Sequence, residues 1–123
     1  MRKMLKVMLT EDGSETLHEL AGILRSNNCE VSTVIKDGTQ IVEKLKSGEV
    51  PDVLLMDIQM PELDGIEATR RIRAFLPDIP IIAMTAHTMK GDAEKCLEAG
   101  MQDHIAKPID PETLFAALQW ARG

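Results

Sequence analysis

The sequence predicts an α/β fold in which helices cover both faces of a parallel β-sheet. The first observation is that strand-like and helix-like segments alternate five times along the 123 residues. The second is that the segments VLLM at 53–56 and IIAM at 81–84 are apolar at every position, as in strands buried on both faces. The third is that the connections are short, which favours βα repeats with right-handed crossovers. We therefore expect one doubly wound domain over residues 1–123.

Two strand–helix pairs account for the first half of the chain. Residues 4–10 form a short apolar strand candidate, and residues 30–35 form a β-branched one. Residues 14–28 and 39–48 carry apolar side chains at helical spacing, and a glycine at the end of the second segment suits a helix terminus. The apolar stripes of these two helices consist of Leu17, Leu20, Ala21 and Leu24, and of Ile41, Val42 and Leu45.

Three further pairs complete the alternation. Pro77 ends the first of these helices, because the residue before a proline disfavours helical geometry. Asp110 is the expected N-cap of the last helix, with Pro111 in its first turn. The expected strands are 52–57, 79–85 and 103–106, and the expected helices are 65–76, 89–100 and 110–122.

Two residues of the first helix have no evident role. His18 and Gly22 are four positions apart, but a helical zinc motif would need a second histidine where Gly22 stands. Gly22 costs the helix about 1 kcal/mol relative to alanine, and nothing in the sequence explains it.

The composition excludes several classes of function. A net charge of −6 is the wrong sign for a non-specific nucleic-acid binder, and two Phe, one Trp and no Tyr leave little for stacking on bases. Cys29 and Cys96 form no metal motif and are expected to be buried thiols. The N-terminus is too short and charged for a signal peptide, and no apolar run has transmembrane length. We expect a soluble, cytoplasmic chain.

Reactive side chains stand at the ends of four predicted strands. Glu11 and Asp12 follow the first strand, Asp57 ends the third, Thr85 ends the fourth and Lys107 follows the fifth. The carboxyl ends of parallel strands meet at one edge, where open α/β sheets place their binding sites. The apolar run before Asp57 makes a carboxylate there costly unless a cation meets it.

This set of side chains indicates a divalent cation and a phosphoryl group. Close carboxylates repel one another, and Mg²⁺ relieves that repulsion while keeping room for water and phosphate oxygens. Lys107 and Thr85 offer donors to an anion, and an aspartate such as Asp57 can act as a nucleophile toward phosphorus. Taken singly, the acidic pair could cap a helix, Asp57 could form an Asx turn and Lys107 could form a surface ion pair. Their convergence on one edge favours the site.

Four segments of the chain resemble the receiver domain of two-component response regulators. They are TED at 10–12, LLMDIQMPELDGIEATRRIR at 54–73, PIIAMTAH at 80–87 and AKPID at 106–110. The similarity covers essentially the whole chain. It is chemotaxis-regulator-like, and in motif style it is closest to the receivers of hybrid sensor histidine kinases. The resemblance implies a flavodoxin-like, five-stranded parallel sheet of order 2-1-3-4-5 with five helices.

The resemblance also implies a phosphoacceptor and a metal site. Asp57 would be the phosphoacceptor, and Mg²⁺ would be the cofactor. Asp12 and Asp57 would ligate the metal, Glu11 would assist through water, and Gln59 would supply its backbone carbonyl.

The resemblance implies a second group of residues that bind the phosphoryl group and switch with it. Lys107 would bridge the acids and later bind a phosphoryl oxygen, with its bond to Pro108 in the cis form. Thr85 would rotate toward the phosphoryl group, beside Ala86. His104 stands where many relatives carry an aromatic switch residue, so either it switches or it simply lines the surface.

The resemblance implies a phosphorylation-controlled switch and not an enzyme, apart from self-phosphorylation from a donor and slow autodephosphorylation. The donor would be a histidine kinase or a histidine phosphotransfer domain, and the fourth helix, fifth strand and fifth helix could form a homodimer. The chain would be part of a hybrid kinase or, alternatively, a stand-alone regulator. A Mg²⁺-dependent aspartyl phosphatase, a flavin carrier and a receiver that acts only as a scaffold are the other hypotheses.

Overall fold

Five parallel strands form one sheet, as the sequence predicted. The structure is a computed structural model that describes residues 4–10, 14–26, 28–57, 65–85, 90–106 and 109–122. The strands are β1 (Leu5–Thr10), β2 (Cys29–Ile35), β3 (Val53–Asp57), β4 (Ile81–Thr85) and β5 (Asp103–Ala106). Their order in the sheet is β2-β1-β3-β4-β5, and all four pairings are parallel. This is the predicted order.

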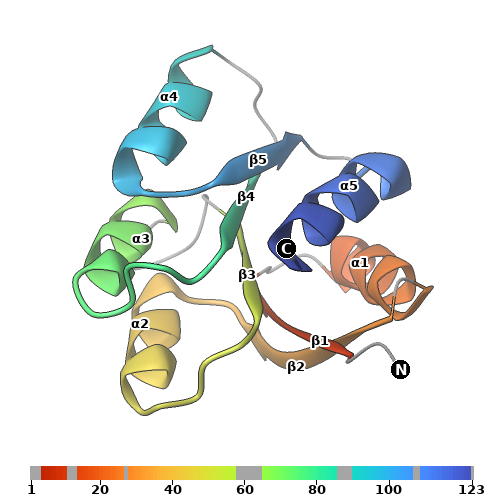
Figure 1. Cartoon of the computed structure of the whole chain (residues 1–123), viewed down its shortest axis with the longest axis horizontal. Coiled ribbons are helices and arrows are strands. Elements are labelled where there is room, and N and C mark those ends of the chain that lie inside the picture. Colours follow the sequence, from red (N-terminus) through yellow and green to blue (C-terminus); the bar gives the residue numbers. More distant parts are fainter. Residues whose placement is uncertain are drawn as a thin grey trace.

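Helices cover the two faces of the sheet. They are α1 (Ser14–Ser26), α2 (Gly38–Lys46), α3 (Gly65–Arg73), α4 (Lys90–Ala99) and α5 (Pro111–Arg122). In Figure 1, α2, α3 and α4 lie to the left of the sheet, and α1 and α5 lie to its right. The predicted α/β, doubly wound, flavodoxin-like architecture with five helices is confirmed.

The alternation of side chains along the strands divides the core between these two faces. On β1, Leu9 packs with α1 and α5, whereas Met8 packs with α2, α3 and α4. On β3, Leu55 and Leu54 divide in the same way, and all four side chains are fully buried. The central strands are therefore covered on both faces, which explains why their sequences are apolar throughout.

The two cysteines are buried, as expected, in different parts of this core. Cys29 belongs to the cluster under α1 and α5, and Cys96 belongs to the cluster under α2, α3 and α4. Their side chains lie on opposite faces of the sheet. Each fills space in its own cluster as a small apolar group.

A β-bulge at Ser32 reverses the direction in which the following side chains of the edge strand β2 point. Val7 pairs with Val31 but Met8 pairs with Thr33, so Ser32 is an extra residue on β2. Its hydroxyl donates to the Val7 carbonyl at 3.4 Å. One inserted residue reverses the side-chain direction beyond it.

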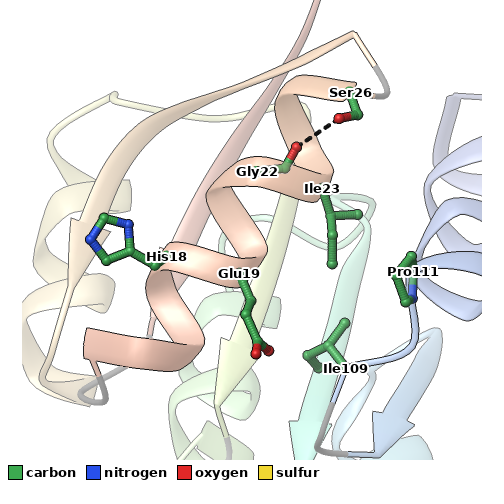
Figure 2. Close-up of a pocket in the computed structure, with 7 residues that line it drawn as sticks. All are labelled: His18, Glu19, Gly22, Ile23, Ser26, Ile109 and Pro111. Carbon is green, nitrogen blue, oxygen red and sulfur yellow. Dashed lines mark hydrogen bonds between the residues drawn. The ribbon is translucent and has the colours of Figure 1, made fainter.

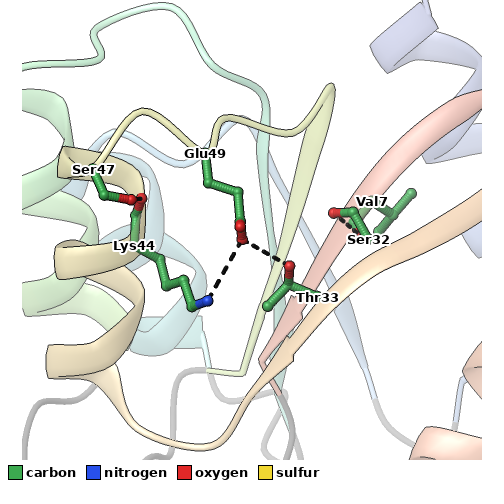
Figure 3. A network of polar contacts seen from close by, with 6 residues as sticks. All are labelled: Val7, Ser32, Thr33, Lys44, Ser47 and Glu49. Carbon is green, nitrogen blue, oxygen red and sulfur yellow. Dashed lines mark hydrogen bonds and ion pairs between the residues drawn. The ribbon is translucent and has the colours of Figure 1, made fainter.

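The reversal turns Thr33 toward α2. Figure 3 shows the Thr33 hydroxyl donating to the Glu49 carboxylate at 2.8 Å, with Lys44 of α2 3.9 Å from the same carboxylate. Ile35, two residues further along, packs in the core on that side of the sheet. The bulge thus connects the edge strand to α2, and the sequence pattern did not reveal it.

Local hydrogen bonds set the helix starts. Asp110 is the N-cap of α5, because its carboxylate accepts from the Thr113 N–H at 3.3 Å and from the Thr113 hydroxyl at 2.7 Å. This cap was predicted from the sequence. The N-cap of α2 was not: there the Asp37 carboxylate accepts from the Thr39 N–H at 2.7 Å.

Four helices end earlier than expected, and one of them is α2, which ends at Lys46 instead of residue 48. The helix expected to reach residue 28 ends at Ser26, because Asn28 adopts a left-handed φ of 60°. The helix expected to reach residue 76 ends at Arg73, and its last turns are completed by the bonds of Ala74 and Leu76 to the α3 carbonyls. α4 was expected to reach residue 100 but ends at Ala99, and Gly100 after it has a φ of +108°.

Arg73 explains why α3 ends where it does. Its guanidinium donates to three acceptors: the Gly100 carbonyl at 2.9 Å, the Leu76 carbonyl at 3.0 Å and the Gln102 side chain at 2.8 Å. The same Gln102 oxygen accepts from the Ile81 N–H at 2.7 Å. We call Arg73, Gly100 and Gln102 the Arg73 clamp. It connects the end of α3 to the start of β4 and to the α4–β5 connection.

Candidate functional site

Asp57 is a buried carboxylate at the end of the central strand. It is the last residue of β3 and is only 3% exposed, after four fully buried apolar residues. β1 and β4 flank β3 on its two sides. A carboxylate in such a place requires charged or hydrogen-bonding partners, which is the expectation drawn from the sequence.

Thr10 provides one hydrogen bond at this position. The Asp57 backbone N–H donates to the Thr10 hydroxyl oxygen at 2.7 Å, and the Thr10 side chain is fully buried. Thr10 is the last residue of β1 and pairs with Met56. Thr10 belongs to the motif TED at 10–12, but no role was predicted for it from the sequence. A polar residue directly after the apolar run at 7–9 was the available signal.

The ends of four strands lie side by side at the edge that carries Asp57. Thr10 pairs with Met56, Asp57 pairs with Met84, and Thr85 pairs with Ala106. The structure therefore brings together the strand ends from which the predicted site was assembled.

Most of the predicted side chains themselves lie outside the described residues. This holds for Glu11, Asp12, Gln59, Ala86, Lys107 and Pro108, and for the side chain of Thr85. Thr10 and Ala106 directly precede Glu11 and Lys107 in the sequence, and both are at the edge described above. The described residues fix the ends of the strands, and the roles of these side chains stay predictions.

His104 is exposed on the edge strand β5. It pairs with Ala83 of β4, two residues before Thr85, and its backbone N–H donates to the Asp103 carboxylate at 2.8 Å. Its role as a switch residue stays a prediction.

The Asp57 carboxylate fits a hard cation such as Mg²⁺. Carboxylate oxygens are preferred magnesium ligands, and a metal held by few protein oxygens needs an accessible rim such as the carboxyl edge of a sheet. Within the described residues, no group of three or more His, Cys, Asp or Glu side chains is placed to hold a metal. The other predicted acidic ligands, Glu11 and Asp12, lie outside that part of the chain.

A separate hollow lies between α1 and the start of α5. Its volume is about 660 Å³, and Figure 2 shows Ile23 of α1 facing Ile109 and Pro111. Gly22 also lines it, and its carbonyl accepts from the Ser26 hydroxyl at 3.0 Å. None of the residues that line this hollow was predicted to belong to the site.

Comparison with known proteins identifies the class of protein that has this fold and carries a candidate site at the ends of its strands. A family model of the response regulator receiver domain matches residues 7–119. The chain therefore belongs to the receiver domain family of two-component signal transduction. Receiver domains are signalling switches that interact with histidine kinases or phosphotransfer proteins. The resemblance expected from the sequence is confirmed.

Individual relatives agree with this assignment. The chain is 43% identical over 118 residues to the signal transduction histidine-protein kinase BarA of Escherichia coli, covering 93% of this chain and 12% of the kinase. It is 40% identical over 121 residues to hybrid signal transduction histidine kinase I of Dictyostelium discoideum, covering 92% of this chain and 7% of the kinase. The chain thus spans a small part of these relatives.

A solved structure is similar over nearly the whole chain. It is the receiver domain of sensor histidine kinase PA1611 from Pseudomonas aeruginosa, with a magnesium ion coordinated in its active site cleft. The TM-score is 0.84 and the identity is 37%, with 97% of this chain and 98% of that chain covered. In the described part of the present chain, none of the helices has the length and apolar character needed to cross a membrane.

Proposed function

We propose that this chain is a phosphoacceptor receiver domain in which Asp57 takes a phosphoryl group from a phosphohistidine of a partner. The observation that carries the proposal is the buried Asp57 at the carboxyl end of the central strand, beside the ends of β1 and β4. A nucleophilic carboxylate at the edge where such folds bind ligands, in a chain of this family, supports that role.

The transfer requires no oxidant or further reactant. An Asp57 carboxylate oxygen attacks phosphorus, and the P–N bond breaks as its electron pair returns to the imidazole nitrogen. The products are an acyl phosphate on Asp57 and an unmodified histidine on the partner. In the slow reset, a water oxygen attacks phosphorus, the bond from phosphorus to the carboxylate oxygen breaks, and inorganic phosphate leaves.

The proposal includes a Mg²⁺ site. Asp12 and Asp57 would hold the ion, Glu11 would assist through water, and the backbone carbonyl of Gln59 would complete the protein ligands. When bound, the ion would offset negative charge on the transferring phosphoryl oxygens. The magnesium ion described for the Pseudomonas receiver domain supports this choice of metal.

The remaining predicted residues would bind and sense the phosphoryl group. Lys107, held by a cis bond to Pro108, would bind one phosphoryl oxygen. Thr85 and Ala86, at and just after the end of β4, would bind another, and His104 on the neighbouring strand would respond to the movement of Thr85. The parallel pairing of β4 with β5 supports this grouping.

The output face would be formed by α4, β5 and α5. Three large apolar side chains are exposed on these helices: Leu97 of α4, and Phe115 and Trp120 of α5. These exposed apolar side chains are available for contact with a partner, and we include a phosphorylation-dependent homodimer through α4, β5 and α5 in the proposal.

The proposal extends to the context of the chain. Residues 1–123 would be one receiver domain of a hybrid histidine kinase, because the curated relatives quoted above are histidine kinases of which it spans a small part. A stand-alone regulator is the alternative. The domain would act in the cytoplasm as a switch whose only reactions are its own phosphorylation and slow dephosphorylation.

Incubation with acetyl phosphate and Mg²⁺, followed by intact mass spectrometry, tests the proposal. The wild-type chain should gain one phosphoryl group, and Asp57→Asn should gain none. Asp52→Asn is the matched control, because Asp52 lies just before the opposite end of β3 and accepts from the Lys6 N–H at 2.8 Å. It should label like the wild type. An unlabelled wild type, or equal labelling of Asp57→Asn, would overturn the proposal.

A further inference from the structure

Buried polar side chains are few in the described part of the chain. Only Thr10, Asp57 and Thr69 fall in this class. Thr69 is explained within its own helix, because its hydroxyl donates to the Gly65 carbonyl at 2.7 Å. Thr10 differs, because its hydroxyl bonds to a residue of another strand, and that residue is Asp57.

The bond connects two strands at the site. Thr10 ends β1 and directly precedes Glu11 and Asp12, the expected metal-binding acids, while Asp57 ends β3. The hydroxyl oxygen accepts from the Asp57 N–H at 2.7 Å in a fully buried environment. A buried hydrogen bond of this kind is directional, so it restrains the Asp57 backbone relative to the end of β1.

We propose that Thr10 is a positioning residue for phosphoryl transfer. The inference rests on the proposed function, in which Asp57 is the nucleophile. The Thr10 hydroxyl holds the Asp57 backbone in a fixed place relative to the end of β1, the strand that directly precedes Glu11 and Asp12 in the sequence. Phosphoryl transfer depends mainly on the position of the nucleophile relative to metal and phosphate, so looseness at this junction slows the reaction.

Two substitutions separate the hydroxyl from the shape of the side chain. Thr10→Val keeps the branched shape and removes the hydroxyl, whereas Thr10→Ser keeps the hydroxyl. Thr69→Val is the matched control, because it removes a second fully buried threonine hydroxyl whose partner lies within α3. Thr10→Ala replaces Thr10→Val if the valine variant does not fold, since Ala and Ser differ only by the hydroxyl.

Two measurements test the inference. The first is the rate of labelling by acetyl phosphate at several Mg²⁺ concentrations, which separates the maximal rate from apparent metal affinity. The second is hydrogen exchange of the Asp57 amide by NMR without metal or phosphate, which reports on the bond itself. Thr10→Val should lose about fivefold to tenfold in maximal labelling rate and in Asp57 amide protection, as expected for one lost hydrogen bond. Thr10→Ser and Thr69→Val should stay near the wild type in both.

The outcomes separate this inference from the proposed function. A wild type that takes no phosphoryl group overturns both, because the positioning role presupposes the reaction. A labelled wild type with Thr10→Val equally fast overturns the positioning role alone. The role also fails if Thr10→Ser is as slow as Thr10→Val, or if Thr69→Val slows labelling as much, because the effect would then follow packing or stability.

Discussion

At the scale of single residues, a hydrogen bond from the Asp57 backbone N–H to the Thr10 hydroxyl joins two strand ends at the candidate site. Asp57 was identifiable from the sequence as a candidate site residue, because a carboxylate directly after four apolar residues is costly to bury without a compensating partner. Thr10 was not, because a threonine at a strand end is common and its partner is 47 positions away. The hydrogen bond depends on the pairing of β1 with β3, which the sequence alone does not specify.

At this scale, replacing each of two glycines by alanine should change the free energy of unfolding in opposite directions. Gly100 has a φ of +108°, and an added Cβ would stand 2.9 Å from the Arg73 Cγ. Gly100→Ala should therefore lower the free energy of unfolding by about 1–2 kcal/mol. An added Cβ at Gly22 would meet nothing within 4 Å, so Gly22→Ala should raise stability by about 0.5–1 kcal/mol.

Urea denaturation of both variants checks this pair. The structure explains Gly100, whereas no close contact requires a glycine at position 22. A loss of stability in Gly22→Ala, or none in Gly100→Ala, would contradict the description of these two helices.

At the scale of elements, hydrophobic periodicity located each strand and helix, and polar contacts set the helix ends. The third helix was expected to continue to residue 76 because apolar spacing and Pro77 both allowed it. It ends at Arg73 because the guanidinium binds carbonyl and amide oxygens beyond the helix. Such contacts join segments about 30 positions apart and leave no periodic signal. The bulge at Ser32 was missed for the same reason.

The Arg73 clamp gives the element-scale prediction. Arg73→Lys keeps the charge but cannot reach three acceptors with a rigid planar group. We expect a loss of about 2–4 kcal/mol in the free energy of unfolding, since lysine leaves at least one of the part-buried acceptors, the Gln102 oxygen or the Gly100 carbonyl, without its charged donor. Arg70→Lys is the control, because Arg70 contacts only the exposed Glu67 in the described structure; its change should be near zero.

The pH dependence of this loss follows from the pKa of Arg73. Burial lowers that pKa from its ordinary value, and the charge of Asp78 partly offsets the effect. A lowered pKa means that the folded state binds this proton less tightly than the unfolded state. Burying the charged guanidinium therefore destabilises the folded state fully at low and neutral pH. This destabilisation is relieved only as pH rises through the lowered pKa. The guanidinium and the introduced ammonium are both charged at mildly acidic and neutral pH, so the loss in Arg73→Lys should be the same there. Denaturation at about pH 6 and about pH 7.5 checks this.

At the scale of the whole molecule, the fold class followed from sequence pattern, but the strand order required the family resemblance. Alternating elements and doubly apolar strands indicated a covered parallel sheet, and several strand orders satisfy that pattern. The observed order β2-β1-β3-β4-β5 places the ends of β1, β3, β4 and β5 along one edge. The candidate site therefore depends on topology, whereas its residues were predicted one at a time from the sequence.

Metal binding should raise the stability of the whole domain against unfolding. A ligand that binds only the folded state stabilises it by about 2.7 kcal/mol at one hundred times its dissociation constant. Saturating Mg²⁺ should raise the thermal midpoint of the wild type and raise that of Asp57→Asn much less. Calorimetry with and without Mg²⁺ measures both. An equal rise in the two proteins would place the metal elsewhere.

The output face gives a further prediction at this scale. Phosphorylated wild type should dimerise in sedimentation experiments, and Leu97→Glu should prevent this because it places a charge on the exposed face of α4. Val50→Glu is the control, because Val50 is similarly exposed but lies between α2 and β3. Dimers of phosphorylated Leu97→Glu, or a monomeric phosphorylated wild type, would exclude this face as the dimer interface.

Locating the phosphoryl group tests most directly whether Asp57 is the phosphoacceptor. After labelling with acetyl phosphate and Mg²⁺, borohydride reduces an acyl phosphate of aspartate to homoserine, and peptide mass spectrometry identifies the changed position. If Asp57 is the phosphoacceptor, homoserine should appear at position 57 alone. Reduction at Glu11 or Asp12, or at no position in a labelled chain, would contradict that role.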